Sequence, residues 1–179
     1  DDDLLNAPEV AARAEQAGIQ LVTIHGRTRC QFYKGAADWA AIKSVKDAVN
    51  IPVIANGDIV DATTATRALV QSHADGVMIG RGAQGRPWVL AEVAASLHGR
   101  PAPIVPAGTD LVDMVCTHYE AMLDFYGVEL GRKVARKHLG WYMDGAGTQG
   151  DVRRAVLTAA TPAEVLGLMP DALLQGVAA

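Results

Sequence analysis

The chain has 179 residues, of which 50% are hydrophobic and 20% are charged, and its formal net charge is −4. This composition can form a buried core and excludes a chain that is disordered by composition. No apolar stretch reaches the roughly 20 residues of a membrane span, and the acidic start Asp1–Asp3 is unlike a signal peptide, so we expect no membrane partner. The two cysteines, Cys30 and Cys116, lie in unrelated contexts, which excludes a disulfide framework and a cysteine-rich metal site and favours a cytoplasmic protein.

Three short apolar runs in the first hundred residues predict β-strands. They are rich in β-branched residues, each is followed by a turn that contains glycine, and they span Gln20–Ile24, Ile51–Ala55 and Gly76–Ile79. Continuously apolar strands are typical of a parallel sheet that is covered on both faces.

Segments with helical periodicity lie before, between and after these strands. The predicted helices are Ala7–Ala17, Asp38–Val49, Asp61–Ser72 and Pro87–Leu97. Asp38 is a candidate N-cap, and Pro87 suits the first turn of its helix. The αβαβαβα order indicates βα units of a barrel or of a doubly wound sheet. A closed (β/α)8 barrel needs about 250 residues, so a barrel could only be partial here.

The strand pattern ends near Gly99, which makes residues 1–99 the predicted α/β region and residues 100–109, rich in proline, a linker. Residues 110–179 predict a separate helical bundle. Its expected helices are Leu111–Tyr126, Gly131–Met143, Val152–Ala160 and a last helix that begins after a capping box at Thr161–Glu164.

Ligands of parallel α/β folds bind at the carboxyl ends of the strands, and three unusual turns fall there. The second strand is followed by Asn56, Gly57 and Asp58. The third is followed by Gly80–Trp88, where glycines, a helix N-terminus and two arginines, Arg81 and Arg86, suggest a phosphate cradle. The alternative is that such turns only connect strands to helices.

The turn after the first strand begins with His25, which can donate to a ligand or bond to a neighbouring backbone group. Cationic residues (Arg27, Arg29 and Lys34) then surround two aromatic residues (Phe32 and Tyr33). Such a loop can meet a polyanion with exposed bases, or it can simply be solvated. Cys30 has no adjacent base and is expected to be inert.

A second concentration of positive charge lies in the helical region. Arg132, Lys133, Arg136 and Lys137 share one helical face, and Glu129 is the only acidic residue between positions 128 and 143. A basic face is often just solvated surface, but on an acidic chain it can also bind phosphate locally.

Four motifs, taken together in this order, resemble the tRNA-dihydrouridine synthases, and most closely their bacterial B-type, NifR-like branch. The motifs are Thr23–Arg29 with Gln31 and Gly35, Pro52–Ile59, Met78–Trp88, and Ala135–His138 with Trp141 and Tyr142. The resemblance implies an enzyme that uses FMN and NADPH to reduce uridine to 5,6-dihydrouridine in tRNA, with tRNA rather than DNA as its partner. It implies the last three βα units of an FMN-binding TIM barrel, followed by a helical tRNA-binding domain.

The resemblance also implies roles for individual residues. Cofactor contacts are expected from the strand ends, at His25, Asn56, Gly57, Asp58, Gly80 and Arg81. RNA contacts are expected from the first loop and the basic helix, at Arg27, Arg29, Arg132, Lys133, Arg136, Lys137 and His138. No metal site is implied.

The chain departs from the family pattern in its catalytic loop. The family's proton donor is a cysteine in an Asn-x-Gly-Cys-Pro-like loop, which nothing in this sequence matches, so we expect it upstream of Asp1 and expect this chain alone to be inactive. A flavin-dependent barrel acting on a small molecule, and a non-catalytic tRNA-binding fragment, remain as alternatives. A three-stranded sheet with two open edges further predicts self-association.

Overall fold

The computed structural model describes residue 1 and residues 3–174, and it divides into two compact units. The α/β unit comprises Asp1–Ala83 and Trp88–Pro103, and the helical unit comprises Gln84–Pro87 and the chain from Ile104 onwards. The chain passes from one unit to the other within the segment predicted as a linker. The assignment of the short segment Gln84–Pro87 to the helical unit is a feature that the sequence does not indicate.

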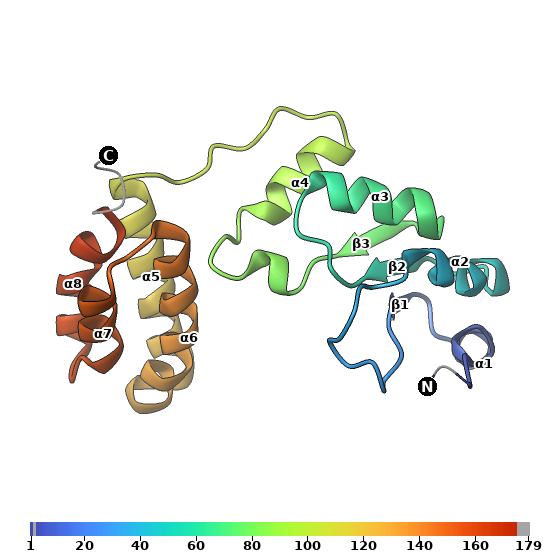
Figure 1. Cartoon of the computed structure of the whole chain (residues 1–179), viewed down its shortest axis with the longest axis horizontal. Helices are drawn as coiled ribbons and strands as arrows, with labels where there is room; N and C mark the ends of the chain where they lie inside the picture. Colours follow the sequence, from blue (N-terminus) through green and yellow to red (C-terminus); the bar gives the residue numbers. More distant parts are fainter. Residues whose placement is uncertain (2, 175–179) are drawn as a thin grey trace. The chain divides into compact units, whose positions relative to one another are not determined.

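The α/β unit contains a parallel sheet of three strands in the order β1-β2-β3. The strands are β1 (Val22–His25), β2 (Val53–Asn56) and β3 (Gly76–Met78), so three parallel strands at the predicted positions are confirmed. In the register, His25 is paired with Asn56, and Asn56 with Met78. The carboxyl ends of all three strands therefore meet at one edge of the sheet (Figure 1). The larger partial barrel remains a prediction.

Four α-helices alternate with these strands: α1 (Ala7–Gln16), α2 (Trp39–Ala48), α3 (Ala62–Ser72) and α4 (Val89–Leu97). Their apolar sides form one core with alternate residues of β2: Val53 and Ala55 are fully buried against helical residues such as Ile42 and Val45. The intervening β2 residues Ile54 and Asn56 are only half-buried. Within the described residues this strand is thus sealed on one face, whereas its apolar pattern predicts cover on both.

Local signals fix the starts of two of these helices. The Asp38 carboxylate accepts a hydrogen bond from the backbone N–H of Ala41, which confirms it as an N-cap. Asp61 and Thr64 form a capping box, so Asp61 precedes α3 instead of beginning it. The expectation for Pro87 is wrong, because α4 begins at Val89. After β3 the chain makes a 3₁₀ turn, η1 (Arg81–Ala83), and a turn with positive φ at Gly85, so Pro87 still lies in the connection.

The helical unit contains α5 (Thr109–Tyr126), α6 (Val128–Ala146), α7 (Gly150–Thr158) and α8 (Pro162–Leu174). The predicted start of the second helix at Gly131 is wrong. Gly131 lies inside α6, where a Cβ would come within 2.8 Å of the Met122 carbonyl oxygen of α5, so this glycine permits a close helix crossing. The capping box at Thr161 and Glu164 is confirmed by reciprocal hydrogen bonds.

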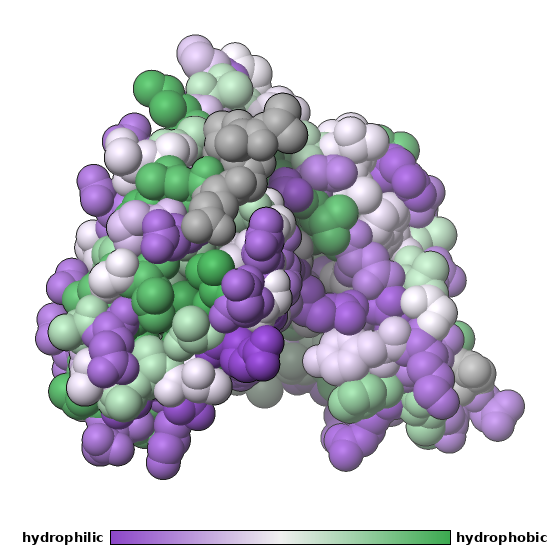
Figure 2. All heavy atoms as spheres, turned by 60° about the vertical axis from the view of Figure 1, so that its left-hand side comes forward, coloured by the Kyte–Doolittle hydropathy of each residue, from purple (hydrophilic) through white to green (hydrophobic). Residues whose placement is uncertain are grey.

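None of the helices in the described residues is both long and apolar enough to cross a membrane. The face of the molecule drawn in Figure 2 carries both hydrophilic and hydrophobic side chains. The last five residues of the predicted helical region, 175–179, lie outside the described part of the chain.

Candidate functional site

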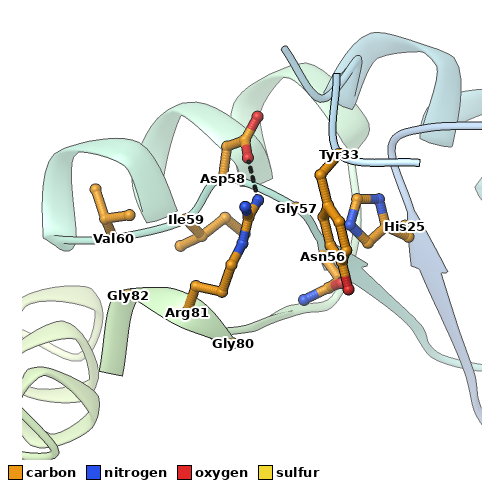
Figure 3. A pocket seen from close by; sticks show the side chains of 10 residues that line it. All are labelled: His25, Tyr33, Asn56, Gly57, Asp58, Ile59, Val60, Gly80, Arg81 and Gly82. Carbon is orange, nitrogen blue, oxygen red and sulfur yellow. Dashed lines mark hydrogen bonds and ion pairs between the residues drawn. The ribbon is translucent and has the colours of Figure 1, made fainter. Parts of the chain in front are cut away.

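A pocket of about 450 Å³ opens at the carboxyl edge of the sheet (Figure 3). Its walls come from the three loops that follow β1, β2 and β3. The lining residues are His25, Tyr33, Asn56, Gly57, Asp58, Ile59, Val60, Gly80, Arg81 and Gly82. The structure therefore brings together all six residues expected at the cofactor site. Arg86 and Pro87 of the predicted phosphate cradle are not among the lining residues.

Asp58 links the three loops. Its Oδ2 accepts hydrogen bonds from Arg27 Nη2 at 2.5 Å and from the Ala37 backbone N–H at 2.8 Å, and its Oδ1 accepts one from Arg81 Nη2 at 3.2 Å. Partial burial opposes the ionisation of Asp58, but the bonds from Arg27 and Ala37 and the nearby charge of Arg81 outweigh it and lower the pKa of Asp58. The carboxylate is thus a cross-link that holds the edge of the pocket together.

Arg27 is an internal residue and not a surface cation. Its side chain is only 3% exposed, and besides Asp58 it donates to the backbone carbonyl oxygens of Lys34 and Gly35. A guanidinium enclosed by its own loop and paired with Asp58 supports the protein, and the expected RNA contact of Arg27 stays a prediction. The sequence does not indicate this environment, because the partner, Asp58, lies 31 positions away.

Gly57 and Asn56 also contact neighbouring parts of the chain. Gly57 has a φ of +112°, and a Cβ there would lie 2.8 Å from the Ala37 Cβ and 3.1 Å from the His25 ring. Only glycine fits this backbone conformation and this close approach. The Asn56 side-chain amide donates to the Met78 carbonyl oxygen at 2.8 Å and so joins the ends of β2 and β3.

His25 stands at the end of β1 with its ring against the pocket (Figure 3). Partial burial and the charge of Arg27 lower the pKa of His25, with a further contribution from Arg81, while Asp58 opposes the change. A lowered pKa keeps the imidazole neutral near pH 7, so it can donate one hydrogen bond and accept another.

Arg81 is the arginine of the pocket that faces solvent. Its side chain is 54% exposed, and its guanidinium lies 4.6 Å above the centre of the Tyr33 ring. Tyr33 and the tether to Asp58 together fix the position of the cation (Figure 3). Nothing local in the sequence marks Tyr33 as a pocket residue, because its partner Arg81 follows a different strand.

The positively charged residues of α6 have two different environments. Lys133, Arg136 and Lys137 are exposed, and we call these three residues the basic face. Arg132 is half-buried and donates from Nη2 to the Ala159 carbonyl oxygen at 2.9 Å, at the end of α7. Arg132 therefore connects two helices, although the sequence groups it with its three exposed neighbours.

His138 is half-buried in a ring cluster of α5 and α6. Its ring centre lies 5.3 Å from that of His118 and 5.0 Å from that of Trp141, and His118 Nδ1 lies 3.0 Å from the Tyr142 hydroxyl. Burial lowers the pKa of both histidines, and the mutual proximity of the rings adds to the effect at His138.

The two cysteines carry no sign of activation. Cys30 is exposed in the loop after β1, and burial, with the charges of Glu120 and Asp113, raises the pKa of Cys116. In the part of the chain that the structure describes, no cluster of His, Cys, Asp and Glu side chains could hold a metal ion.

An arginine-bearing pocket at the carboxyl edge of parallel strands is typical of α/β proteins that bind phosphorylated ligands. Comparison with known proteins gives the particular family: residues 1–177 match the family model described as dihydrouridine synthase (Dus). The chain belongs to the dihydrouridine synthase family.

Individual relatives are similar along most or all of the chain. A probable tRNA-dihydrouridine synthase of Rhodobacter capsulatus is 55% identical over 179 residues, which cover 100% of this chain and 55% of that protein. A probable tRNA-dihydrouridine synthase of Rickettsia conorii is 49% identical over 87% of this chain and 47% of its own length. The tRNA-dihydrouridine synthase B of Xanthomonas axonopodis pv. citri is 43% identical over 99% of this chain and 54% of its own length. The chain spans about half the length of these relatives.

Proposed function

We propose that this chain forms part of a tRNA-dihydrouridine synthase, which reduces uridine in tRNA to 5,6-dihydrouridine with FMN as cofactor and NADPH as reductant. The observation that carries the proposal is the family match over residues 1–177, combined with a pocket at the strand ends that contains an exposed arginine. A tRNA substrate would place the enzyme in the cytoplasm.

The residues of the pocket fit a flavin phosphate. The volume of about 450 Å³ lies in the range of small-molecule sites, and the single exposed guanidinium of the lining belongs to Arg81. Arg81 uses one N–H for Asp58, so other donors remain for phosphate oxygens. FMN, when bound, supplies the hydride chemistry. The residues of this chain bind and orient it: Arg81 and the open backbone at Gly80 at the phosphate, and neutral His25 by a hydrogen bond.

Asp58, Gly57 and Asn56 have a positioning role in this proposal. Asp58 and Tyr33 hold Arg81 in place, Gly57 leaves room for the His25 ring, and Asn56 ties β2 to β3. Preorganisation of this kind means that little rearrangement is required when an anion binds.

The RNA contacts we propose are Arg29 in the loop after β1 and the basic face of α6. These side chains are exposed, and a basic patch on an acidic chain binds a polyanion locally without binding it everywhere. Arg27 and Arg132 instead bond to other parts of the chain, Arg27 to Asp58 and Arg132 to the Ala159 carbonyl oxygen. His138, packed between His118 and Trp141, would reach RNA only through the edge of its ring.

Neither cysteine of this chain is proposed as the proton donor, because neither lies in an Asn-x-Gly-Cys-Pro-like loop and Cys116 has a raised pKa. We therefore expect the 179-residue chain to bind flavin and tRNA without completing the reduction.

The test combines binding with product analysis. The purified chain is incubated with FMN, NADPH and unmodified tRNA, and dihydrouridine is measured by mass spectrometry of the digested RNA. We expect a flavin absorbance near about 450 nm and salt-sensitive tRNA binding, but no dihydrouridine above background. Conversion of uridine at the rate of a complete family enzyme would contradict the absence of a proton donor from this chain.

The same binding data separate two alternatives. Flavin binding without affinity for tRNA would favour a flavoenzyme that acts on a small molecule. Binding of tRNA without flavin would favour a non-catalytic RNA-binding fragment, and the family match makes both alternatives weaker than the synthase.

We also propose that the purified chain self-associates. In the described sheet β1 and β3 each pair only with β2, so each leaves one edge with free backbone groups. Light scattering should show dimers or larger species, and a monomer that melts sharply in calorimetry would contradict this expectation.

A further inference from the structure

Phe32 is an aromatic residue in an unfavourable place. Its side chain is 71% exposed, in the loop after β1, and its backbone has a φ of +54°. A bulky residue with positive φ costs of the order of 1 kcal/mol or more. A ring that is mostly exposed recovers little of that cost by burial, so burial does not explain why phenylalanine occupies this position.

The loop that carries Phe32 is nevertheless well braced. Buried Arg27 donates to the carbonyl oxygens of Lys34 and Gly35 on one side. On the other side, the Thr28 backbone N–H donates to the Gln31 side chain at 2.8 Å, and the Gln31 N–H donates back to the Thr28 hydroxyl. Phe32 is thus held out to solvent by a structured turn.

Its neighbours place Phe32 at the rim of the pocket. The Phe32 ring meets the Tyr33 ring edge to face, with centres 4.6 Å apart, and Tyr33 lines the pocket beneath Arg81. The segment from 27 to 35 carries three cations and no acidic residue, and one of the three, Arg27, is neutralised by Asp58. The remaining charge, on exposed Arg29 and Lys34, favours an anionic partner. The exposed Phe32 ring favours a partner with flat apolar surfaces.

We propose that Phe32 and Arg29 form a nucleobase subsite at the rim of the pocket, in which the Phe32 ring stacks on an unpaired base of the RNA and Arg29 contacts an adjacent phosphate. Arg29 has no side-chain partner among the described residues and is available for this contact. An unpaired base beside a phosphate matches both groups, whereas a protein partner would need a larger apolar area. This inference rests on the proposed function, since it requires tRNA to be the substrate of the enzyme.

The opposite effects of one substitution on stability and on binding provide the test. Phe32→Gly removes the ring and relieves the strain of positive φ, so the melting temperature should rise while RNA affinity falls. Loss of one stacked base weakens binding by about 5-fold to 100-fold. Phe32→Trp should retain the affinity, and Phe125→Ala, which removes an 81% exposed ring in the helical unit, serves as the matched control.

The probe is a single-stranded RNA with one uridine, either intact or with an abasic site on one side of it. The affinity of the unaltered chain should fall with the abasic RNA, while that of Phe32→Gly should be the same for both RNAs. Unaltered RNA affinity in Phe32→Gly, or a fall in its melting temperature, would overturn the subsite. Loss of self-association without loss of RNA binding would also overturn it, in favour of a protein contact. If the unaltered chain binds none of these RNAs, the proposed function fails as well.

Discussion

The loop after β1 and helix α6 are both rich in Arg and Lys, yet their cations lie in different environments. Arg27 is 3% exposed and joins two loops through Asp58, whereas Lys133, Arg136 and Lys137 extend into solvent. Both environments occur within one helix, because Arg132 donates to the backbone at the end of α7 while the residues of the basic face are exposed. The position of a cation relative to the core, more than its place in a charged cluster, decides whether it supports the protein or can contact a ligand.

The largest effect that this comparison predicts is on stability, from Arg27→Met. The substitution leaves the Asp58 carboxylate without its closest donor and frees the carbonyl oxygens of Lys34 and Gly35. Removal of one partner of a buried ion pair costs about 3 to 5 kcal/mol, and since Asp58 is 30% exposed we expect about 3 kcal/mol. Urea denaturation followed by circular dichroism measures it.

The control is Arg13→Met, which breaks an exposed pair with Glu9. Because both side chains are more than 70% exposed, this change should stay within about 0.5 kcal/mol. Similar losses for Arg27→Met and Arg13→Met would show that burial does not distinguish the two arginines.

The next effect is on RNA binding, in the triple variant Lys133→Ser, Arg136→Ser and Lys137→Ser. Loss of two or three phosphate contacts should weaken tRNA binding about 10-fold to 100-fold at moderate salt and reduce the slope of log K against log salt by about 2. Fluorescence anisotropy at several salt concentrations measures both quantities. An unchanged slope would mean that the basic face is only solvated surface, and an unchanged melting temperature verifies that the variant is folded.

A smaller effect separates Arg132 from the basic face. Arg132→Met removes the bond to the Ala159 carbonyl oxygen, which should cost about 1 to 1.5 kcal/mol of stability. Lys133→Met, one residue later and exposed, should cost less than about 0.5 kcal/mol. Thermal melts of the two variants compare them directly, and equal melting temperatures would remove the distinction.

The smallest effect is a pH dependence of the helical unit. Burial lowers the pKa of His118 and His138 below the ordinary value of 6.5, so in this range the unfolded chain binds more protons than the folded chain. The contribution of these two histidines to the free energy of unfolding is therefore fully present above pH 6.5. It is lost as the pH falls through 6.5 towards their lower pKa values in the folded chain. Asp58, whose ordinary pKa is 3.8, is lowered further and lies outside this window.

Melting temperatures between about pH 7.5 and about pH 5.5 should decline in the unaltered chain, and less steeply in the double variant His118→Asn and His138→Gln. If both proteins decline equally, the two rings do not titrate differently in the folded and unfolded chain.

Features encoded by a few adjacent residues could be predicted from the sequence. The N-cap at Asp38 and the capping box at Thr161 depend on side chains that bond within three positions, and both are present. The three strands and their parallel order follow from apolar runs separated by helical segments.

Features that depend on distant contacts could not be predicted. Gly131 looks like the start of a helix until α5 is seen to pack against it, and Tyr33 becomes a pocket residue only because Arg81 lies above its ring. The enclosed position of Arg27 could not be predicted for the same reason, since its environment is set by Asp58 on another loop. The six residues expected at the cofactor site do line one pocket, but which of them bond to other protein groups could be seen only in the structure.

The most direct test of the flavin proposal compares FMN with riboflavin, which lacks the phosphate. Both are titrated into the unaltered chain and into Arg81→Gln, and binding is followed by the quenching of flavin fluorescence. The unaltered chain should bind FMN about 10-fold or more tightly than riboflavin, and Arg81→Gln should lose that preference while its affinity for riboflavin stays the same. Equal affinity of the unaltered chain for the two flavins would contradict a phosphate site at Arg81.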